Sequence, residues 1–435
     1  MRTAFLLAAL LAAAPLEAQD LPYKAKGENV GAVNCASSLC HGSVSPWKDS
    51  NVLQNEYVTW SRVDKHATKA YQALFNERSK RIAANLGYRE PAHQVKLCLD
   101  CHDYNPSPAQ RGERFTPTDG IQCEACHGPA GGWIRTHVEA GATHAENVAH
   151  GMYPTDEPVA QAKLCLSCHF GNADKFVTHR IMGAGHPRMS FELDTFMQTQ
   201  PPHFVVDDDW RKRKGDWDPI RVWAIGQALA ARELVDVLLD PKRSRDGLFP
   251  ELVVFDCHAC HHAMSDTRWS PRTGTSPGRI RLNDANLLML RHIVRRIASH
   301  DASAAFNARV AELHRAVAGD GGDVVATARA LRTALDDTTR TLQARRFTPA
   351  DLRAMLDSLV ADGLDGRYRD YAGAEQATMA IAGLMDFLAK AGALRDVRGA
   401  NRALDALYAT VKNDENYKPE RFREALGALA RSLGT

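Results

Sequence analysis

The sequence is short of several features that would each have indicated a large class of proteins. Beyond the N-terminus it has no apolar run of the roughly 20 residues that a membrane-spanning helix needs. Its formal net charge is only +2 over 435 residues, which argues against nucleic acid as the main partner. It also has no unpaired cysteine, because its ten cysteines fall into five pairs. Apolar and charged fractions of 44% and 24% are those of an ordinary globular protein of two or three domains.

Every cysteine pair is followed directly by a histidine. Two cysteines separated by two residues and followed by histidine form the attachment sequence of a c-type haem. Each thiol can form a thioether to a haem vinyl group, and the adjacent histidine reaches the iron from the proximal side. Zinc ribbons and disulfide frameworks have no reason to place histidine there every time. The sequence therefore predicts five covalently attached c haems, at Cys35/Cys40-His41, Cys98/Cys101-His102, Cys123/Cys126-His127, Cys165/Cys168-His169 and Cys257/Cys260-His261.

The first pair differs from the others, because four residues separate Cys35 from Cys40. This spacing is a known variant of the haem attachment sequence, although a surface disulfide or a redox pair without a metal would also use two cysteines. The following His41-Gly42 matches His127-Gly128 of the third pair. We therefore interpret the first pair as a haem site too.

Thirteen histidines remain after the five motif histidines, more than the five distal ligands that full bis-histidine coordination requires. A lone histidine is usually a surface or satisfied core residue, but clustering near the motifs favours ligands. Glycines near position 185 would allow the backbone to approach a macrocycle closely. Met182 and Met189 stay open as alternative ligands. The predicted distal ligands are His66, His137, His179, His186 and His203.

The N-terminus has the pattern of a secretory signal. Arg2 provides a basic start, residues 4–15 form an apolar stretch too short to span a bilayer, and Leu16-Glu17-Ala18 offers a cleavage site. The alternative is a buried N-terminal helix. We expect residues 1–18 to be a signal peptide and the mature protein to be periplasmic, with no transmembrane span.

The remaining chain is expected to be mainly α-helical, in two parts. Residues 19–268 would form a loop-rich multihaem domain, and only 21 residues separate Cys101 from Cys123, so haems must supply much of the apolar interior. Residues 269–435 would form a helical bundle without haem sites. Helical spacing predicts a helix over 52–86 and an amphipathic one over 216–240. Glycines predict helix breaks at 319–322, 362–366 and 390–392.

Outside the predicted ligands, polar residues are expected to be ordinary. His258, between two cysteines, should face solvent. His292, His300 and His314 should lie on the surface and not bind haem. If one of the three is a ligand, His292 is the best candidate, because it is near the haem region in the sequence. The basic run 211–214 is most simply a solvated loop, with a docking patch for an acidic redox partner as the alternative.

Residues 30–265 resemble a known family. The stretch Gly120 to His127 with Gly128-Pro129, and the loop Ala184-Gly185-His186-Pro187, are similar to multihaem cytochromes c related to the tetrahaem electron carrier of ammonia oxidisers. That superfamily also contains hydroxylamine oxidoreductase and pentahaem nitrite reductase. The resemblance implies a mainly helical, loop-rich fold with haems in close stacked and perpendicular pairs, largely bis-histidine ligated. The spacing at Cys35/Cys40 departs from the usual pattern.

Three functions are compatible with this pattern. The catalytic haem of pentahaem nitrite reductase has a proximal lysine, whereas all five sites here end in histidine, so electron transfer is expected, with no catalytic residue assigned. The alternative is an oxidoreductase acting on a small nitrogen or sulfur compound at one five-coordinate haem, at the Cys35 or the Cys257 site. The third is a structural subunit of a respiratory complex. Expected partners are periplasmic redox proteins, including a membrane quinone-oxidising or terminal reductase complex.

Overall fold

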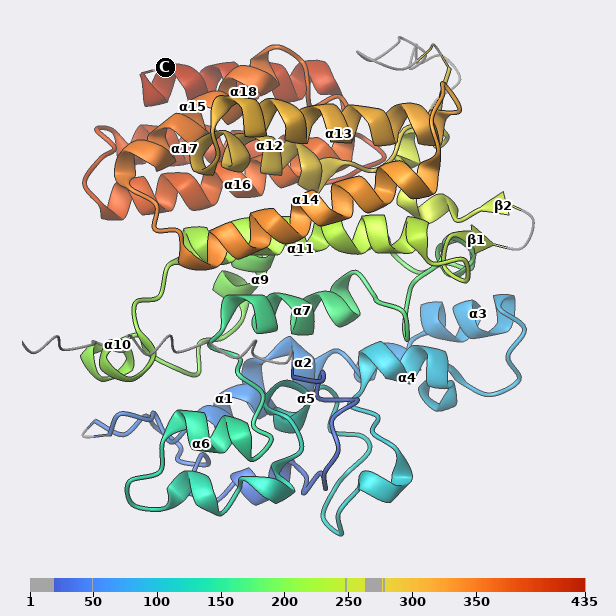
Figure 1. The fold of residues 1–435 in the computed structure, drawn as a ribbon. Helices are drawn as coiled ribbons and strands as arrows, with labels where there is room; N and C mark the ends of the chain where they lie inside the picture. Colours follow the sequence, from blue (N-terminus) through green and yellow to red (C-terminus); the bar gives the residue numbers. More distant parts are fainter. Residues whose placement is uncertain (1–18, 49, 247–248, 263–275, 277, 435) are drawn as a thin grey trace, which may run out of the picture.

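The computed structural model describes residues 19–48, 50–246, 249–262, 276 and 278–434. The predicted signal peptide, residues 1–18, lies outside this range. The prediction of a mainly α-helical chain is confirmed: within the described residues the only strands are β1 (Arg245–Asp246) and β2 (Phe249–Pro250), which pair antiparallel. Figure 1 shows long helices stacked in one half of the molecule, with short helices and loops of the N-terminal region in the other.

The N-terminal half consists of short helices. They are α1 (Glu56–Val63), α2 (Lys65–Thr68), α3 (Glu77–Asn85), α4 (Lys96–His102), α5 (Cys123–His127), α6 (His144–Ala149), α7 (Pro158–His169), α8 (His179–Gly183), α9 (Leu193–Thr199) and α10 (Asp208–Lys214). The basic run 211–214 is therefore the end of a helix and not the loop that we expected. Its side chains are largely exposed, and Arg211 and Arg213 form ion pairs with acidic residues one turn earlier.

The single helix predicted over 52–86 is wrong. Asp64 has an extended backbone, and its carboxylate accepts a hydrogen bond from the N–H of His66, so α1 ends and α2 begins at this residue. Asn76 does the same for α3 by accepting from the N–H of Ser79. Side chains of this kind compete with helical hydrogen bonding and favour the N-cap position, where they break a periodic apolar pattern.

The C-terminal half is a bundle of long helices. They are α11 (Pro219–Leu239), α12 (Ala285–Ile297), α13 (His300–Ala318), α14 (Val324–Ala344), α15 (Pro349–Leu364), α16 (Tyr371–Lys390), α17 (Val397–Thr410) and α18 (Pro419–Leu433). The three predicted breaks are confirmed, since they coincide with the ends of α13, α15 and α16. Within the described residues, no helix combines the length and apolarity needed to cross a membrane.

Helix α11 lies at the centre of the molecule and not at its surface. The helix expected over 216–240 is confirmed, and it is a packing element, but with 14 of its 21 residues buried it is covered on more than the single face that an amphipathic pattern predicts. It packs against α7 and α9 on one side and against α12 and α14 on the other (Figure 1). The apolar core consequently runs without interruption from Ala162 in α7 to Leu433 in α18. Apolar packing thus extends to both sides of residue 268, and the domain border there stays a prediction.

Candidate functional site

Three of the five motifs are the last turns of helices. Helices α4, α5 and α7 each end at the motif histidine. The two cysteines and the histidine then stand at positions i, i+3 and i+4, which share one face of an α-helix. All ten cysteines are free thiols in the structure. We number the sites 1 to 5 in chain order, each site being one motif.

Cys260 of site 5 is the predicted attachment residue whose surroundings disagree with those of the others. It is exposed, whereas the other nine cysteines are partly buried. The reason is local, because this motif forms a short 3₁₀-helix, η8 (Cys257–Ala259), which ends before Cys260 and replaces the α-helical turn seen at sites 2 to 4. The partly buried position of the other nine thiols is therefore not found at Cys260. Haem attachment at this residue stays a prediction.

Four motif histidines have a second histidine ring in front of them. In each case the second ring belongs to a histidine predicted as a distal ligand. The ring centroids are 6.4 Å apart in one pair and 6.3 Å apart in the other three; the pairs are His41–His137, His102–His186, His66–His169 and His179–His261. The pairs join residues as far apart in the chain as 66 and 169, so tertiary folding creates them.

This separation fits two axial ligands on one haem iron. Histidine nitrogens bind transition metals at about 2.0–2.1 Å, and each ring centre lies about 1.1 Å behind its nitrogen, which places two opposed ring centres about 6.3 Å apart. The observed distances of 6.3–6.4 Å match. A porphyrin supplies four equatorial nitrogens, so two opposed imidazoles complete its coordination.

The fifth motif histidine, His127, and the remaining predicted distal ligand, His203, are arranged differently. His137 could have folded back over the His127 site from ten residues on, but its ring lies beside His41 instead. Burial, together with the nearby charges of His203 and Lys214, lowers the pKa of His127 to about 4. The ring of His203 contacts Phe204 edge-on, at 6.1 Å between centroids. A neutral imidazole is the form that binds a metal, so the environment of His127 suits a ligand. His203 lies near enough to His127 to lower its pKa.

Hydrogen bonds to Nδ1 fix the orientation of four of these histidines. The acceptors are carboxylates for His41 (Glu56 Oε2, 2.9 Å) and His66 (Asp64 Oδ1, 3.1 Å). They are carbonyl oxygens for His102 (Ala70, 2.9 Å) and His186 (Pro187, 2.8 Å). A carbonyl oxygen and an ionised carboxylate can only accept hydrogen bonds. Nδ1 must therefore carry the proton, which leaves the lone pair of a neutral ring on Nε2. Nε2 is then the atom free to bind iron.

The motifs lie close to one another in an order that differs from the sequence. The thiols of Cys35 of site 1 and Cys123 of site 3 lie near enough to shift each other's pKa, and so do those of Cys101 of site 2 and Cys168 of site 4. Cys126 of site 3 lies near enough to Cys165 of site 4 to raise the pKa of that thiol. Site 3 therefore adjoins sites 1 and 4, and site 4 also adjoins site 2.

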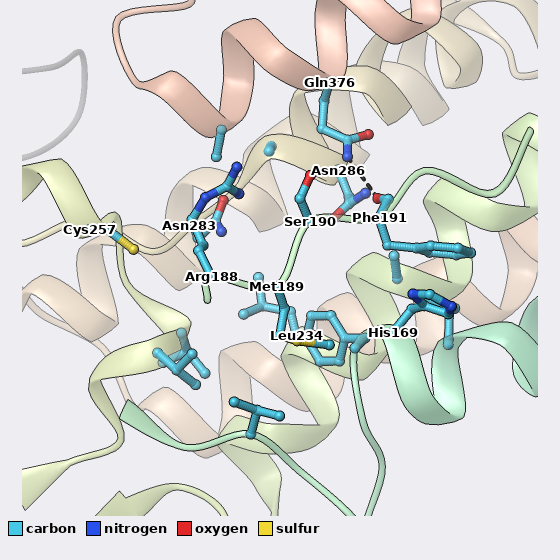
Figure 2. Close-up of a pocket in the computed structure, with 18 of the residues that line it drawn as sticks. His169, Arg188, Met189, Ser190, Phe191, Leu234, Cys257, Asn283, Asn286 and Gln376 are labelled. Atoms are coloured by element: carbon cyan, nitrogen blue, oxygen red, sulfur yellow. Dashed lines mark hydrogen bonds between the residues drawn. The ribbon is translucent and has the colours of Figure 1, made fainter. Parts of the chain in front are cut away.

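Site 5 adjoins site 4 through a cavity. The cavity has a volume of about 90 Å³ and is lined by His169 of site 4 at one end and Cys257 of site 5 at the other. Figure 2 shows Arg188, Ser190 and Phe191 on the segment between these two residues, with Gln376 approaching from the C-terminal bundle. Arg188 is held there by Glu375, because both carboxylate oxygens accept from its Nη2, at 3.0 and 2.9 Å. Met182 and Met189 also line this cavity.

Two residues around site 3 were missed by sequence reasoning. Glu124, between the two cysteines of the motif, is buried and accepts hydrogen bonds from the N–H groups of Val30, Gly31 and Ala130 at 2.8–2.9 Å. Gln122 accepts from the N–H of Ala32 at 2.8 Å. These contacts attach the segment before site 1 to site 3. No sequence signal indicates them, because the middle positions of the motif accept almost any residue.

Expectations for four other histidines can be compared with the structure. His258 is buried near the ring of Tyr371, so its solvent-facing position was wrong. His292 is buried too, with Nδ1 2.7 Å from Ser358 Oγ and Nε2 3.3 Å from Asp362 Oδ2, because the bundle closes around it. His300 is exposed as expected. His314 is mostly buried and contacts Asp284 at 3.1 Å, so its surface position was wrong as well.

Five Cys-Cys-His motifs thus stand on a helical, loop-rich framework, and the histidines of four of them lie beside a second histidine ring. Residues 34–128 match the family model described as cytochrome c554 and c-prime. The match covers the first three motifs and supports a relation of this region to multihaem c-type cytochromes, which bind haem covalently; the C-terminal helices lie outside it. No match was found among the curated proteins or among the solved structures.

Proposed function

We propose that the protein is a periplasmic electron carrier that holds five c haems, each between two histidines. The observation that carries this proposal is the set of four histidine pairs with ring centroids 6.3–6.4 Å apart. Two imidazoles on one iron leave no position for a substrate, and the ligand set changes little between the oxidised and reduced states. Haem held in this way supplies one-electron transfer.

The order of the sites supports transfer within the chain. Contacts between cysteines link site 1 to site 3 and site 2 to site 4, and sites 3 and 4 adjoin. The cavity between His169 and Cys257 adds site 5 beside site 4. Under this proposal electrons move along sites 1, 3 and 4, with sites 2 and 5 as branches from site 4. The two branches and site 1 would be the places where periplasmic redox partners deliver or receive electrons.

An observation at site 3 supports the alternative function, an oxidoreductase with one open haem. Around His127 the side chain of Asp156 contacts His144 (2.9 Å) and Lys214 (3.7 Å). Such polar groups can stabilise a bound anion or transfer protons. At sites 1 and 5, where we expected an open haem if there is one, a second histidine ring faces the motif histidine. If the protein is an enzyme, site 3 is the better candidate.

The test is the optical spectrum of the protein purified from a host that attaches c haems, together with its intact mass. We expect a mass increase of five haems and low-spin bands that carbon monoxide does not change in the reduced protein. A colourless protein, or linked cysteines in place of thioethers, would contradict the haem assignment. A high-spin component that shifts with carbon monoxide would favour the oxidoreductase.

Replacement of a single facing histidine sharpens this test. His186→Ala should create one high-spin haem that binds carbon monoxide, because His186 faces His102 at 6.3 Å. His300→Ala is the matched control, since that side chain is exposed in the C-terminal bundle. An unchanged spectrum in His186→Ala would remove His186 from the ligands.

A further inference from the structure

Two of the histidines proposed as ligands donate to carboxylates, and two donate to neutral carbonyl oxygens. Glu56 accepts from His41 of site 1, and Asp64 accepts from His66, which faces His169 of site 4. Both histidines of site 2 donate to backbone carbonyls. The three sites therefore differ in the charge that their ligands contact.

Both carboxylates are sheltered and held in place. The side chain of Asp64 is 5% exposed and that of Glu56 is 16% exposed. Glu56 also accepts from the N–H of Gln54 at 3.1 Å, and Asp64 from the side chain of Gln200 at 3.1 Å. Within the described residues no lysine or arginine forms an ion pair with either carboxylate, whose ring partner is a histidine, so no such cation offsets the negative charge. A poorly solvated charge of this kind is weakly screened.

The acceptor at Nδ1 changes how an imidazole binds a metal. A hydrogen bond to a carboxylate makes the ring more basic and a stronger electron donor than a bond to a carbonyl does. Stronger donation and a nearby negative charge both stabilise ferric over ferrous iron. The haem at such a site is then harder to reduce.

We propose that Glu56 and Asp64 are positioning residues that lower the reduction potentials of the haems at sites 1 and 4 relative to the haem at site 2. This inference rests on the proposed function, because it concerns the same five haems. It makes site 2 an electron-accepting end of the branched path. Both carboxylates stand on the segment 56–64, so one short stretch of chain sets two potentials.

The experiment is a potentiometric titration of the complete holoprotein, followed by optical and electron paramagnetic resonance spectra. In Glu56→Gln and Asp64→Asn the charge is removed and one oxygen remains to accept from the histidine, while the other oxygen, which accepts from Gln54 or Gln200, is replaced by an NH2 group; asparagine also serves as an N-cap. Each variant should raise one midpoint potential, by at least a tenfold change in the reduction equilibrium, which is about 59 mV for one electron. The two variants should move different haems.

Asp119→Asn is the matched control, because Asp119 is a half-buried carboxyl before site 3. Asp119→Asn should change every midpoint potential by less than Glu56→Gln and Asp64→Asn do. The charge-retaining variants Glu56→Asp and Asp64→Glu should keep low potentials, which separates a charge effect from a loss of packing. Five low-spin haems with unchanged potentials in both neutral variants would overturn the inference and leave the proposed function standing. Absence of haem from the unmodified protein would instead contradict the proposed function.

Discussion

The two halves of the molecule fill their interiors in different ways. From α7 and α9 onward, the C-terminal half shares one continuous core of buried apolar side chains. In the described residues before α7, the second apolar cluster consists of Tyr71, Leu74, Ala83 and Ala92. A region of this size with so few clustered apolar residues cannot offset the conformational entropy of its own folding. The region before α7 therefore needs an apolar component that side chains do not supply, and the haems proposed at sites 1 to 3 would supply it.

Histidines follow the same division. In the first half they lie in pairs with ring centres about 6 Å apart, and four of them are anchored through Nδ1. In the bundle, buried His292 is satisfied on both nitrogens by Ser358 and Asp362. A residue satisfied on both nitrogens is a packing element, whereas one anchored on a single nitrogen keeps the other free for a ligand.

The largest expected effect follows from preventing haem attachment, which would remove the proposed interior of the first half. Production in a host without haem attachment, or the variant Cys126→Ala, should prevent folding of residues 19–157 and leave the bundle folded, because only the bundle has its own core. Hydrogen exchange with mass spectrometry would show fast exchange before α7 and slow exchange in α11 to α18. Equal protection of both halves without haem would contradict the proposal that cofactors form the interior.

The next effect tests the bundle alone. Leu335 in α14 is fully buried, so Leu335→Ala should lower the free energy of unfolding of the bundle by about 2–5 kcal/mol. The haem spectrum should not change. Val325→Ala is the control on the same helix, where the side chain is 44% exposed, and its effect should stay within about 0.5 kcal/mol. Chemical unfolding followed by circular dichroism measures both; a shifted haem spectrum in Leu335→Ala would show that the halves are strongly coupled.

The smallest effect concerns α9, where the two halves meet. Burial and the neighbouring Glu192 raise the pKa of Asp194 to about 7. A raised carboxyl pKa means that its contribution to stability is complete below the unfolded value of about 4 and is lost as pH rises through 7. Asp194→Asn should therefore stabilise the protein by about 2–4 kcal/mol at pH 8 relative to pH 4. Thermal unfolding at both pH values measures this difference; the same gain at both would contradict the assigned pKa.

The features that could be predicted from the sequence are those that depend only on the spacing of neighbouring residues. The five motifs and the breaks between the bundle helices needed only neighbouring residues, and they could be placed from the sequence. The burial of α11 depends on helices that pack against it from both sides, so its apolar pattern alone was misleading. Asp64 ends a helix that apolar periodicity extended. The roles of Glu56 and Glu124 arise from contacts between segments 15 and more than 90 residues apart, which no spacing rule reveals.

The contacts of Glu124 also determine the order in which parts of the chain can reach their final structure during synthesis. Residues 30 and 31 leave the ribosome, and any export channel, well before the carboxylate that accepts their N–H groups. This segment must therefore wait about 90 residues of synthesis for its partner. Site 1 follows this segment directly, so its surroundings are completed only after site 3 has formed. The first attachment sequence to emerge would then be among the last parts of the molecule to reach its final structure.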